Sequence, residues 1–298
     1  MNAAAGAAVT SCLLCGGALR PKFVTPTTRL HIAACRACGA WMLAALPSDD
    51  ERRALYGEHY FDSWGDPDDL ASGVYRMKQQ TFRRFFRALG KFHAPGRLLD
   101  VGCAFGASLA VAQQLGWDVT GLELNPHAAA KARVTFGERI LSAEFETAPL
   151  AAGSFDALVM SDVLEHLPNP RAAMTRVHQL LRDGGVVVIN TPCVDSLSAR
   201  LLQRDWPNLK AEHLCYPSRR GVTALLRETG FACVRMQPTT KVLNLLYVDR
   251  IMQHYAVRVL TPCVRRVIAC LPPRWRQYNF STRSGEMFVI ARKITRAS

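Results

Sequence analysis

Strand-like and helix-like segments alternate between residues 97 and 190, and this alternation constrains the fold more than any other feature. The first unit is a buried strand over 97–101, a glycine-rich turn and a helix over 107–115. Further elements are predicted as strands over 118–122, 140–141, 155–160 and 186–190 and a helix over 170–181. Such alternation forms a mainly parallel sheet, which binds ligands at the carboxyl ends of its strands. The sequence therefore predicts an α/β protein.

The turn after the first strand is suited to a nucleotide-like ligand. Gly102 and Gly106 let the backbone approach a ligand closely at the positive end of the following helix. Ala104 stands where a G-x-G-x-G pattern has another glycine, so the loop alone is a weak signal. Glu123 ends the second strand about 20 residues further on, where an acid hydrogen-bonds ribose hydroxyls. The unit is therefore predicted to be Rossmann-like.

Several short motifs together resemble a known enzyme family. They occupy residues 99–106, 121–123, 154–156, 162–166 and 184–185. In this combination they resemble class I S-adenosylmethionine-dependent methyltransferases. Residues 191–197, 206–207 and 212–214 are similar to a bacterial subgroup whose members often act on glycans, sugar nucleotides or other small metabolites. The resemblance covers about residues 12–240 and the last strand.

The resemblance also completes the expected fold. It implies a seven-stranded sheet whose last strand runs antiparallel between the fifth and the sixth. The sixth strand is predicted over 231–237 and the seventh over 287–292. About 50 residues separate them, where the family has a short connection.

The family pattern assigns residues to the methionine and ribose parts of S-adenosylmethionine. Asp100, Gly102 and Gly106 would hold the methionine part through side chain and backbone. Glu123 would bind the ribose hydroxyls, which agrees with the reading from its spacing.

The same pattern assigns residues to the adenine and to the reactive methyl group. Glu144 lies where the family has an acid near the adenine amino group, and Phe145 would flank the ring. Ser161 and Asp162 would line the opening toward the methyl group.

Methyl transfer to a hydroxyl needs positioning and a base, and two histidines are candidates. His213 is either a general base or a structural hydrogen-bonding residue, and His166 follows the fourth strand. Asp162, Glu165 and His166 fall at i, i+3 and i+4, which predicts one helical face. This spacing resembles the metal-binding set of ubiquinone-pathway and small-RNA O-methyltransferases, whose first residue is usually glutamate. A second divalent cation is one reading; the other is that Glu165 caps the helix and His166 packs beneath the cofactor.

Two cysteine pairs near the N-terminus predict a metal site. Cys12 and Cys15 form the first pair, and Cys35 and Cys38 form the second. This spacing is typical of a zinc site, because each tight turn presents two thiolates to one tetrahedron. Four thiolates leave no open coordination position, so a structural Zn²⁺ in a small N-terminal zinc ribbon is expected. The other six cysteines are predicted to be small core residues.

Aromatic residues outside these motifs have several expected places. A helix over 74–89 carries an apolar stripe that is expected to pack on the sheet and help cover the cofactor: Met77, Phe82, Phe85, Phe86 and Leu89. Trp206 and Tyr216 wall the acceptor pocket or belong to the core. A lid is a further hypothesis for Tyr56, Tyr60, Phe61 and Trp64.

Positive charge is concentrated near the C-terminus. The chain has a net charge of +13, and residues 241–298 hold eleven Lys and Arg residues against Asp249 and Glu286. Residues 242–260 and 264–271 have helical apolar spacing, which indicates a basic helical insertion at about 241–284. The insertion is a solvated face, a contact for an anionic membrane or lipid phosphate, or a grip for a sugar-nucleotide phosphate or nucleic acid.

These features predict the domain organisation and function. A zinc-ribbon-like module is expected over 1–45, a helical linker or lid over 46–93, and the methyltransferase domain over 94–298. The function expected is O-methylation of a small molecule, sugar nucleotide or lipid-linked glycan precursor, with a phosphate-bearing acceptor among the candidates. Alternatives are an RNA methyltransferase and a non-catalytic S-adenosylmethionine-binding scaffold. The expected location is the cytoplasm, with a peripheral site at the inner face of the membrane as a refinement.

Overall fold

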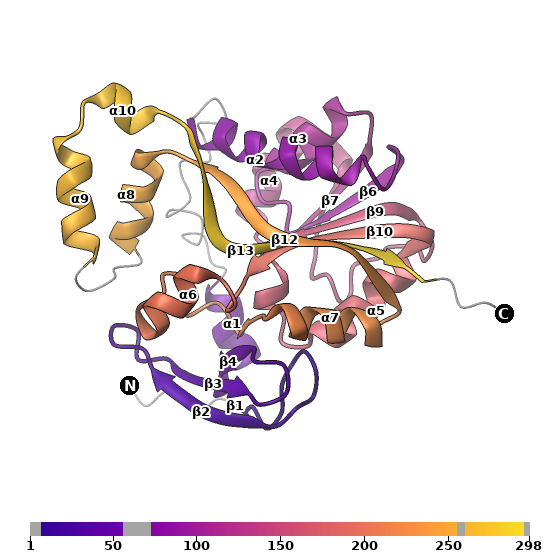
Figure 1. Ribbon diagram of the computed structural model, residues 1–298. Helices are drawn as coiled ribbons and strands as arrows, with labels where there is room; N and C mark the ends of the chain where they lie inside the picture. The colour runs from indigo at the N-terminus through magenta and orange to yellow at the C-terminus, as the bar shows by residue number, and fades with distance from the viewer. Residues whose placement is uncertain (1–6, 56–72, 255–259, 295–298) are drawn as a thin grey trace.

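A seven-stranded sheet forms the centre of the computed structural model, which describes residues 7–55, 73–254 and 260–294 (Figure 1). Its strand order is β12-β13-β10-β9-β6-β7-β8. The strands are β6 (Arg97–Val101), β7 (Asp118–Glu123), β8 (Ile140–Ser142), β9 (Phe155–Ser161), β10 (Leu181–Pro192), β12 (Phe231–Leu243) and β13 (Phe280–Lys293). The strands β6 to β10 pair in parallel, and β13 pairs antiparallel with β10 and β12. The predicted sheet, with an antiparallel last strand between the fifth and sixth, is confirmed.

Helices cover both faces of this sheet (Figure 1). One face packs against α2 (Gly73–Leu89), α3 (Ala107–Gln114) and α4 (Pro126–Phe136). The opposite face packs against α5 (Pro170–Leu180) and α7 (Arg219–Glu228). Asn-Pro pairs begin α4 and α5, because the asparagine side chain accepts a backbone N–H and proline suits the first helical position.

The apolar stripe of α2 packs on the sheet as predicted. Met77, Phe85, Phe86 and Leu89 are buried, and the ring centroid of Phe85 lies 4.7 Å from that of Phe288 on β13. This packing fixes the N-terminal half of α2 above the carboxyl ends of the strands. The predicted lid residues Tyr56, Tyr60, Phe61 and Trp64 lie outside the described residues.

The N-terminal segment forms a small sheet that is completed by a later part of the chain. Its strands are β1 (Ala7–Ala8), β2 (Leu19–Val24), β3 (His31–Cys35), β4 (Trp41–Leu43) and β5 (Ala45–Leu46), followed by α1 (Asp49–Leu55). The four-stranded sheet has the order β11-β4-β3-β2, and β11 (Cys215–Tyr216) comes from beyond β10. Leu14 and Met42 belong to the core cluster under α5 and α7, so the small sheet and the large one share a core.

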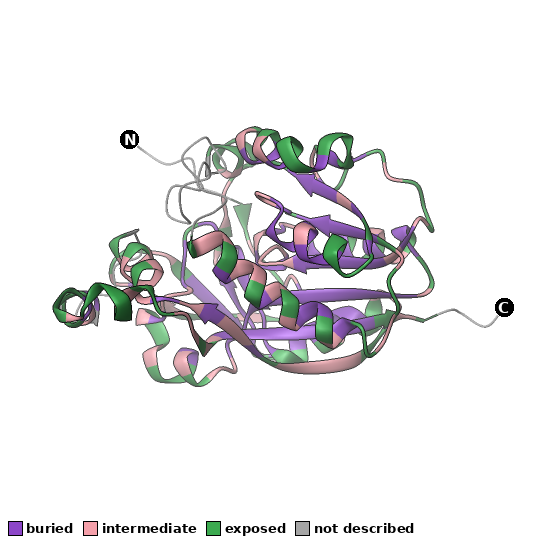
Figure 2. Cartoon of the chain, turned by 90° about the horizontal axis from the view of Figure 1, so that it is seen from above, coloured by how far each residue is buried: buried purple, intermediate pink, exposed green. Residues whose placement is uncertain are grey.

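The insertion after β12 is shorter in its helical part than predicted. Helices α8 (Leu245–His254), α9 (Leu260–Cys270) and α10 (Pro273–Gln277) project beyond the sheet and carry exposed residues on their outer side (Figures 1 and 2). The flanks of the predicted 241–284 insertion are strand instead, because the β12–β13 ladder resumes after an irregularity between Pro238 and Thr240. The sheet therefore extends to the base of the insertion.

Two further expectations concern single residues and membrane spans. Cys103, Cys193 and Cys215 are buried as predicted, whereas Cys233, Cys263 and Cys270 are exposed, so the prediction of six core cysteines is wrong for three. The exposed three lie on the edge strand β12 and on the projecting α9, which have solvent on one side.

Within residues 7–55, 73–254 and 260–294, no helix combines the length and apolar character needed to cross a bilayer.

Candidate active site

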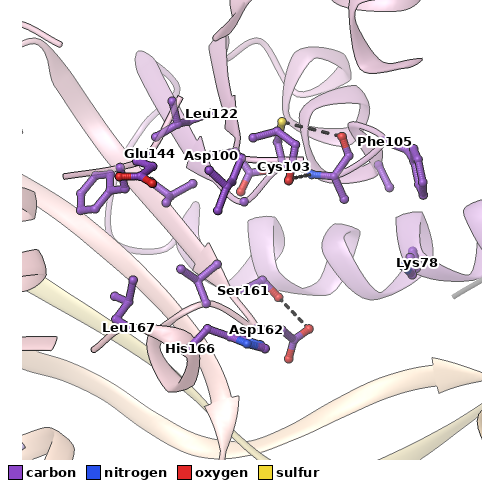
Figure 3. A pocket seen from close by; sticks show the side chains of 18 of the residues that line it. Lys78, Asp100, Cys103, Phe105, Leu122, Glu144, Ser161, Asp162, His166 and Leu167 are labelled. Atoms are coloured by element: carbon purple, nitrogen blue, oxygen red, sulfur yellow. Dashed lines mark hydrogen bonds between the residues drawn. The ribbon is translucent and has the colours of Figure 1, made fainter. Parts of the chain in front are cut away.

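A cavity of about 420 Å³ opens at the carboxyl ends of β6, β7 and β9 (Figure 3). The glycine turn after β6 and the ends of β7 and β9 form one side, and α2 with the start of α8 forms the other. The predicted site residues in its lining are Asp100, Gly102, Glu123, Glu144, Phe145, Ser161, Asp162 and His166. Residues far apart in the sequence thus meet at one sheet edge, as parallel strand ends do.

Glycine is required at two positions of the turn for steric reasons. Gly102 has φ +71° and Gly106 has φ +79°, a region that favours glycine. A Cβ on Gly102 would lie 2.8 Å from Val163 Cγ2, and one on Gly106 would collide with the Phe136 ring. Ala104, the departure from the glycine pattern, also has positive φ at +47°. A ligand in the cavity can therefore approach the backbone of this turn closely.

Two buried carboxyl groups lie at the sheet side of the cavity. Glu123 accepts the Ala104 N–H on one oxygen and the Asn125 N–H on the other, each at 2.8 Å. A carboxylate has about four acceptor sites, so further sites remain for hydroxyl donors. Burial raises the pKa of Asp100 to about 8, partly offset by the nearby Ser108 hydroxyl. Burial also raises the pKa of Glu123, although the backbone N–H groups that donate to its carboxylate act to lower it. Such a pair favours a ligand with cationic and hydroxyl groups.

The predicted adenine residues form another wall. Phe145 is buried, and the Arg176 guanidinium lies 5.6 Å from the centroid of its ring. Glu144 is partly exposed and pairs with Arg53 of α1 at 3.3 Å. The flat ring and the acid thus lie side by side at the cavity edge, which is the arrangement needed to contact a purine and its amino group.

The predicted helical face of Asp162, Glu165 and His166 does not exist. Only a 3-10 helix over Leu164–His166 forms, and Asp162 precedes it with a left-handed φ of +59°. Its carboxylate is held by Lys241, whose Nζ lies 3.1 Å from both oxygens. Glu165 instead accepts a hydrogen bond from Thr191 Oγ1 at 2.8 Å and does not cap the helix. The three predicted ligands of a second cation therefore do not converge.

A different trio gathers beside the cavity. One ligand atom each from Glu165, His166 and His213 lies within 4.8 Å of the others. His166 Nδ1 faces the Glu212 carbonyl at 3.0 Å, so Nδ1 carries the hydrogen and Nε2 is the basic nitrogen. Burial lowers the pKa of His166 to about 4 and raises that of Glu165 to about 8. Burial and the neighbouring His166 also lower the pKa of His213. The trio therefore carries little charge near neutral pH.

The structure separates the two candidate bases. His166 lines the cavity, whereas His213 is buried behind it, with ring centroids 4.8 Å apart. His213 makes the structural hydrogen bond that was one of its two readings, since Nδ1 faces the Asn208 carbonyl at 2.9 Å. Trp206 and Tyr216 are also core: they pack with Trp41 of the small sheet and do not line the cavity.

The residues of the opposite wall were not predicted from the sequence. Tyr75 and Lys78 of α2 line the cavity together with Lys241 and Tyr247. Burial lowers the pKa of Lys78 to about 8, with Asp162 opposing and Lys241 adding to the effect. Lys78 lies four residues before Phe82, so the sequence alone places it on the apolar stripe of the helix. A lysine within this stripe could therefore have been recognised as a candidate site residue. No comparable signal exists for Lys241, because its place depends on how far β12 extends.

The four N-terminal cysteines meet at one point. Cys12 Sγ lies 3.6 Å from Cys38 Sγ, and Cys15 Sγ lies 3.5 Å from Cys35 Sγ. A tetrahedral zinc with Zn–S bonds of about 2.3 Å separates its sulfurs by roughly 3.8 Å, so the donor set fits the ion. Gly16 and Gly39, which directly follow the two pairs, also fit a tight turn at each pair, because both have positive φ.

A family model described as a methyltransferase domain matches residues 74–236, more than half of the chain. The chain belongs to this methyltransferase family. Its sheet has the class I methyltransferase order, so the predicted family and fold are confirmed.

Curated relatives are similar over a shorter segment. The ubiquinone biosynthesis O-methyltransferase of Xanthomonas axonopodis pv. citri is 36% identical over 105 residues, which are 33% of this chain and 44% of that protein. That of Nitrosococcus oceani is 35% identical over 101 residues, 32% of this chain and 43% of that protein. The chain thus spans less than half the length of these curated relatives.

Solved structures share the fold over most of the chain. A 1,6-didemethyltoxoflavin-N1-methyltransferase of Burkholderia thailandensis, solved with 1,6-didemethyltoxoflavin and S-adenosylhomocysteine, has 18% identity and a TM-score of 0.52. The alignment covers 93% of this chain and 100% of that one. The YcgJ protein of Bacillus subtilis has 13% identity and a TM-score of 0.52, covering 73% of this chain and 100% of that one. At these identities the likeness shows the fold.

Proposed function

We propose that this protein transfers the methyl group of S-adenosylmethionine to a hydroxyl of a small molecule. The observation that carries the proposal is the cavity in which the glycine turn meets two buried carboxyl groups, Asp100 and Glu123. S-adenosylmethionine carries an ammonium, a ribose with two hydroxyls and an adenine, and each has a complementary group in this lining. The ubiquinone biosynthesis O-methyltransferases among its relatives support an oxygen acceptor.

The residues present fit the cofactor. The Asp100 carboxyl, whose pKa burial raises to about 8, would be stabilised as a carboxylate by the methionine ammonium. Glu123 is fixed by two backbone N–H groups and would accept the ribose hydroxyls. Glu144 and Phe145 would take the adenine. Gly102 would leave the backbone accessible to the methionine part, and Gly106 with its positive φ would shape the turn.

When bound, S-adenosylmethionine supplies an electrophilic methyl group on a sulfonium. The protein has to place an acceptor oxygen in line with it, exclude water and accept the hydroxyl proton. Ser161 lies at the end of β9 on the cavity wall and would border the methyl group. We place proton acceptance on Nε2 of His166, because His166 lines the cavity and His213 does not.

The acceptor would enter between α2 and the start of α8. Tyr75 and Tyr247 offer flat apolar surfaces there, and Lys78 offers a positive charge. These groups support a hydroxyl-bearing metabolite as the acceptor, including a sugar nucleotide or a lipid-linked glycan precursor with a phosphate.

We also propose that the exposed face of α9 and α10 contacts an anionic membrane. Exposed Val267, Trp275 and Tyr278 lie there among arginines.

The four-cysteine cluster is proposed to hold a structural Zn²⁺. Support comes from the sulfur separations and from Gly17, where a Cβ would lie 3.1 Å from Cys35 Sγ. A side chain at residue 17 would therefore push the sulfurs apart.

Calorimetric titration with S-adenosylhomocysteine tests the cofactor site directly. We expect one binding site per chain and a loss of at least about tenfold in affinity for Glu123→Gln, which weakens the ribose contacts. The control is Glu138→Gln, an exposed acid outside the cavity lining, which should bind like the wild type. An absence of binding by the folded wild type would refute the proposed function.

A further inference from the structure

A partly buried ammonium group, that of Lys241, lies where four strands meet at the acceptor end of the cavity. Lys241 Nζ of β12 lies 3.1 Å from both carboxylate oxygens of Asp162 and 2.8 Å from the carboxylate of Glu286 on β13. Asn190 of β10 donates to both acids, at 3.0 Å to Asp162 and 2.8 Å to Glu286. Thr239 Oγ1 donates to the Asn190 carbonyl oxygen at 2.6 Å, which fixes the amide orientation. The cluster therefore joins β9, β10, β13 and β12.

The hydrogen-bonding capacity of this cluster is almost fully used inside the protein. An ammonium has three N–H donors, and Lys241 has four carboxylate oxygens within reach, two from Asp162 and two from Glu286. The Asp162 carboxylate receives Lys241 on both oxygens, Asn190 on one and Ser161 Oγ at 3.5 Å on the other. A carboxylate has about four acceptor sites, so Asp162 has little capacity left for a metal ion.

The charge on Lys241 is maintained by its partners. Burial alone would lower the pKa of Lys241, but Asp162 and Glu286 hold it above its usual range. Without this cation two carboxylates would share a partly buried space, which disfavours the ionisation of both. A positive charge at this point, either from the chain or from a bound ion, therefore stabilises the two acids in their ionised form.

We propose that Lys241 is a tethered cation that takes the place of a divalent metal ion between Asp162 and Glu286. It is a positioning residue, because it holds Asp162 and, through it, Ser161 at the cavity wall. The acceptor end is then assembled without a metal in this cluster. This proposal rests on the proposed methyl transfer only for its functional consequence. Removing divalent cations with a chelator would leave Ser161 and Asp162 in place at the acceptor end of the cavity.

Removal of the lysine charge tests the proposal, with Mn²⁺ as the probe. Lys241→Met removes the ammonium but keeps a similar volume, and it leaves the two carboxylates of Asp162 and Glu286 as hard ligands. We expect this variant to bind free Mn²⁺ about tenfold or more tightly than the wild type, measured by electron paramagnetic resonance. Its melting temperature should rise with Mn²⁺. Lys241→Arg, which keeps the charge, should gain neither effect.

Two further variants make the result specific. The double variant Lys241→Met/Asp162→Asn should lose the gained Mn²⁺ site, and Lys91→Met, at an exposed lysine, should resemble the wild type. Mn²⁺ bound at the Glu165, His166 and His213 trio would be common to all variants and would cancel in the comparison. No gain by folded Lys241→Met would overturn the proposal.

Mn²⁺ binding by the wild-type protein provides an independent test of the proposal. If its Mn²⁺ binding is lost on Asp162→Asn, then Asp162 is a metal ligand and the proposal is wrong. If Lys241→Met does not fold, this comparison decides alone, and unchanged Mn²⁺ affinity in Asp162→Asn supports the tethered cation. Because the readout is Mn²⁺ binding, it is separate from the S-adenosylhomocysteine titration that tests the proposed function.

Discussion

At the scale of single residues, the cavity is dominated by acids whose protonation depends on burial. Burial raises the pKa of Asp100 and of Glu165 to about 8, well above the usual values for these side chains of about 4. Both folded pKa values lie above the unfolded ones, so the folded state binds more protons between about pH 4 and pH 8. The free energy of unfolding contributed by these groups is therefore greatest at low pH and declines as pH rises toward 8. An ammonium-bearing ligand would reverse part of this decline at Asp100.

Asp100→Asn should separate stability from binding. Asparagine fits the same space without a carboxyl to ionise, so the unliganded variant should be more stable than the wild type by roughly 1–3 kcal/mol near pH 8. The gain should shrink toward pH 5, where Asp100 is protonated in the folded wild type. Affinity for S-adenosylhomocysteine should fall at least about tenfold, because the ammonium loses its charged partner.

Urea unfolding at several pH values, with calorimetry at pH 8, measures both effects. Asp183→Asn is the matched control, because its side chain is 70% exposed and outside the cavity lining. A variant that is less stable than the wild type at pH 8 would show that Asp100 is ionised in the unliganded protein.

At the scale of elements, the cysteine module supports the wall of the cavity. Strand β4 of the module pairs with β11, and the Leu43 N–H donates to the Leu214 carbonyl at 3.1 Å. The Leu214 N–H in turn donates to the Glu165 carbonyl at 2.8 Å. The Ser218 hydroxyl donates to the Cys38 carbonyl at 2.6 Å, which ties the start of α7 to the second cysteine turn. Loss of the module would therefore reach the 3-10 helix that carries His166.

Cys35→Ser/Cys38→Ser should remove the metal and weaken this support. We expect about one Zn²⁺ per wild-type chain by elemental analysis and none in the variant. The free energy of unfolding should fall by several kcal/mol, roughly 3–5, because two sulfur ligands and the clamped turn are lost. Tryptophan fluorescence should report the change, since Trp41 on β4 packs against Trp206.

The control for this experiment is Cys233→Ser/Cys263→Ser, which changes two exposed cysteines elsewhere. It should keep the zinc and the wild-type stability. Retention of zinc by Cys35→Ser/Cys38→Ser would contradict the assignment of the four-cysteine site.

At the scale of the whole molecule, positive charge and exposed apolar groups coincide on the insertion, much of which is exposed (Figure 2). Trp275 is 60% exposed and Tyr278 is 69% exposed, and Arg266 and Arg274 nearby are also exposed. Lys241 does not contribute to this face, because its charge is used inside the protein. The outward charge therefore comes from the arginines of α9 and α10.

Arg266→Ser/Arg274→Ser should weaken binding to anionic vesicles by roughly tenfold or more, because each basic residue near an anionic surface contributes about 1 kcal/mol. Co-sedimentation with phosphatidylcholine vesicles, with and without phosphatidylglycerol, measures this. Trp275→Ala should also weaken binding. The control Arg20→Ser/Arg36→Ser changes two exposed arginines of the N-terminal module and should have little effect. Equal binding to neutral vesicles would rule out an electrostatic contact.

Local patterns in the sequence were sufficient for the sheet and for much of the cavity lining. Gly102 and Glu123 were predicted because strand, turn and spacing are local properties, and parallel strands bring their ends together. Asp100 was implied by the family resemblance. Gly106 belongs with them for its positive φ, although a neighbouring ring rather than the cavity makes glycine necessary there. The cysteine pairs were equally readable, since each pair forms its own turn.

Only the tertiary structure decided the chemistry of the acceptor end. The spacing of Asp162, Glu165 and His166 indicated one helical face, but a left-handed residue at 162 and a short 3-10 helix separate them. Lys241 reaches Asp162 because β12 and β13 continue past an irregularity, and His213 is buried because β11 joins the N-terminal sheet. Local sequence thus determined the fold and the cofactor-facing strand ends. Contacts between distant segments determined which buried charges neutralise one another, because burial and pairing depend on the packed chain.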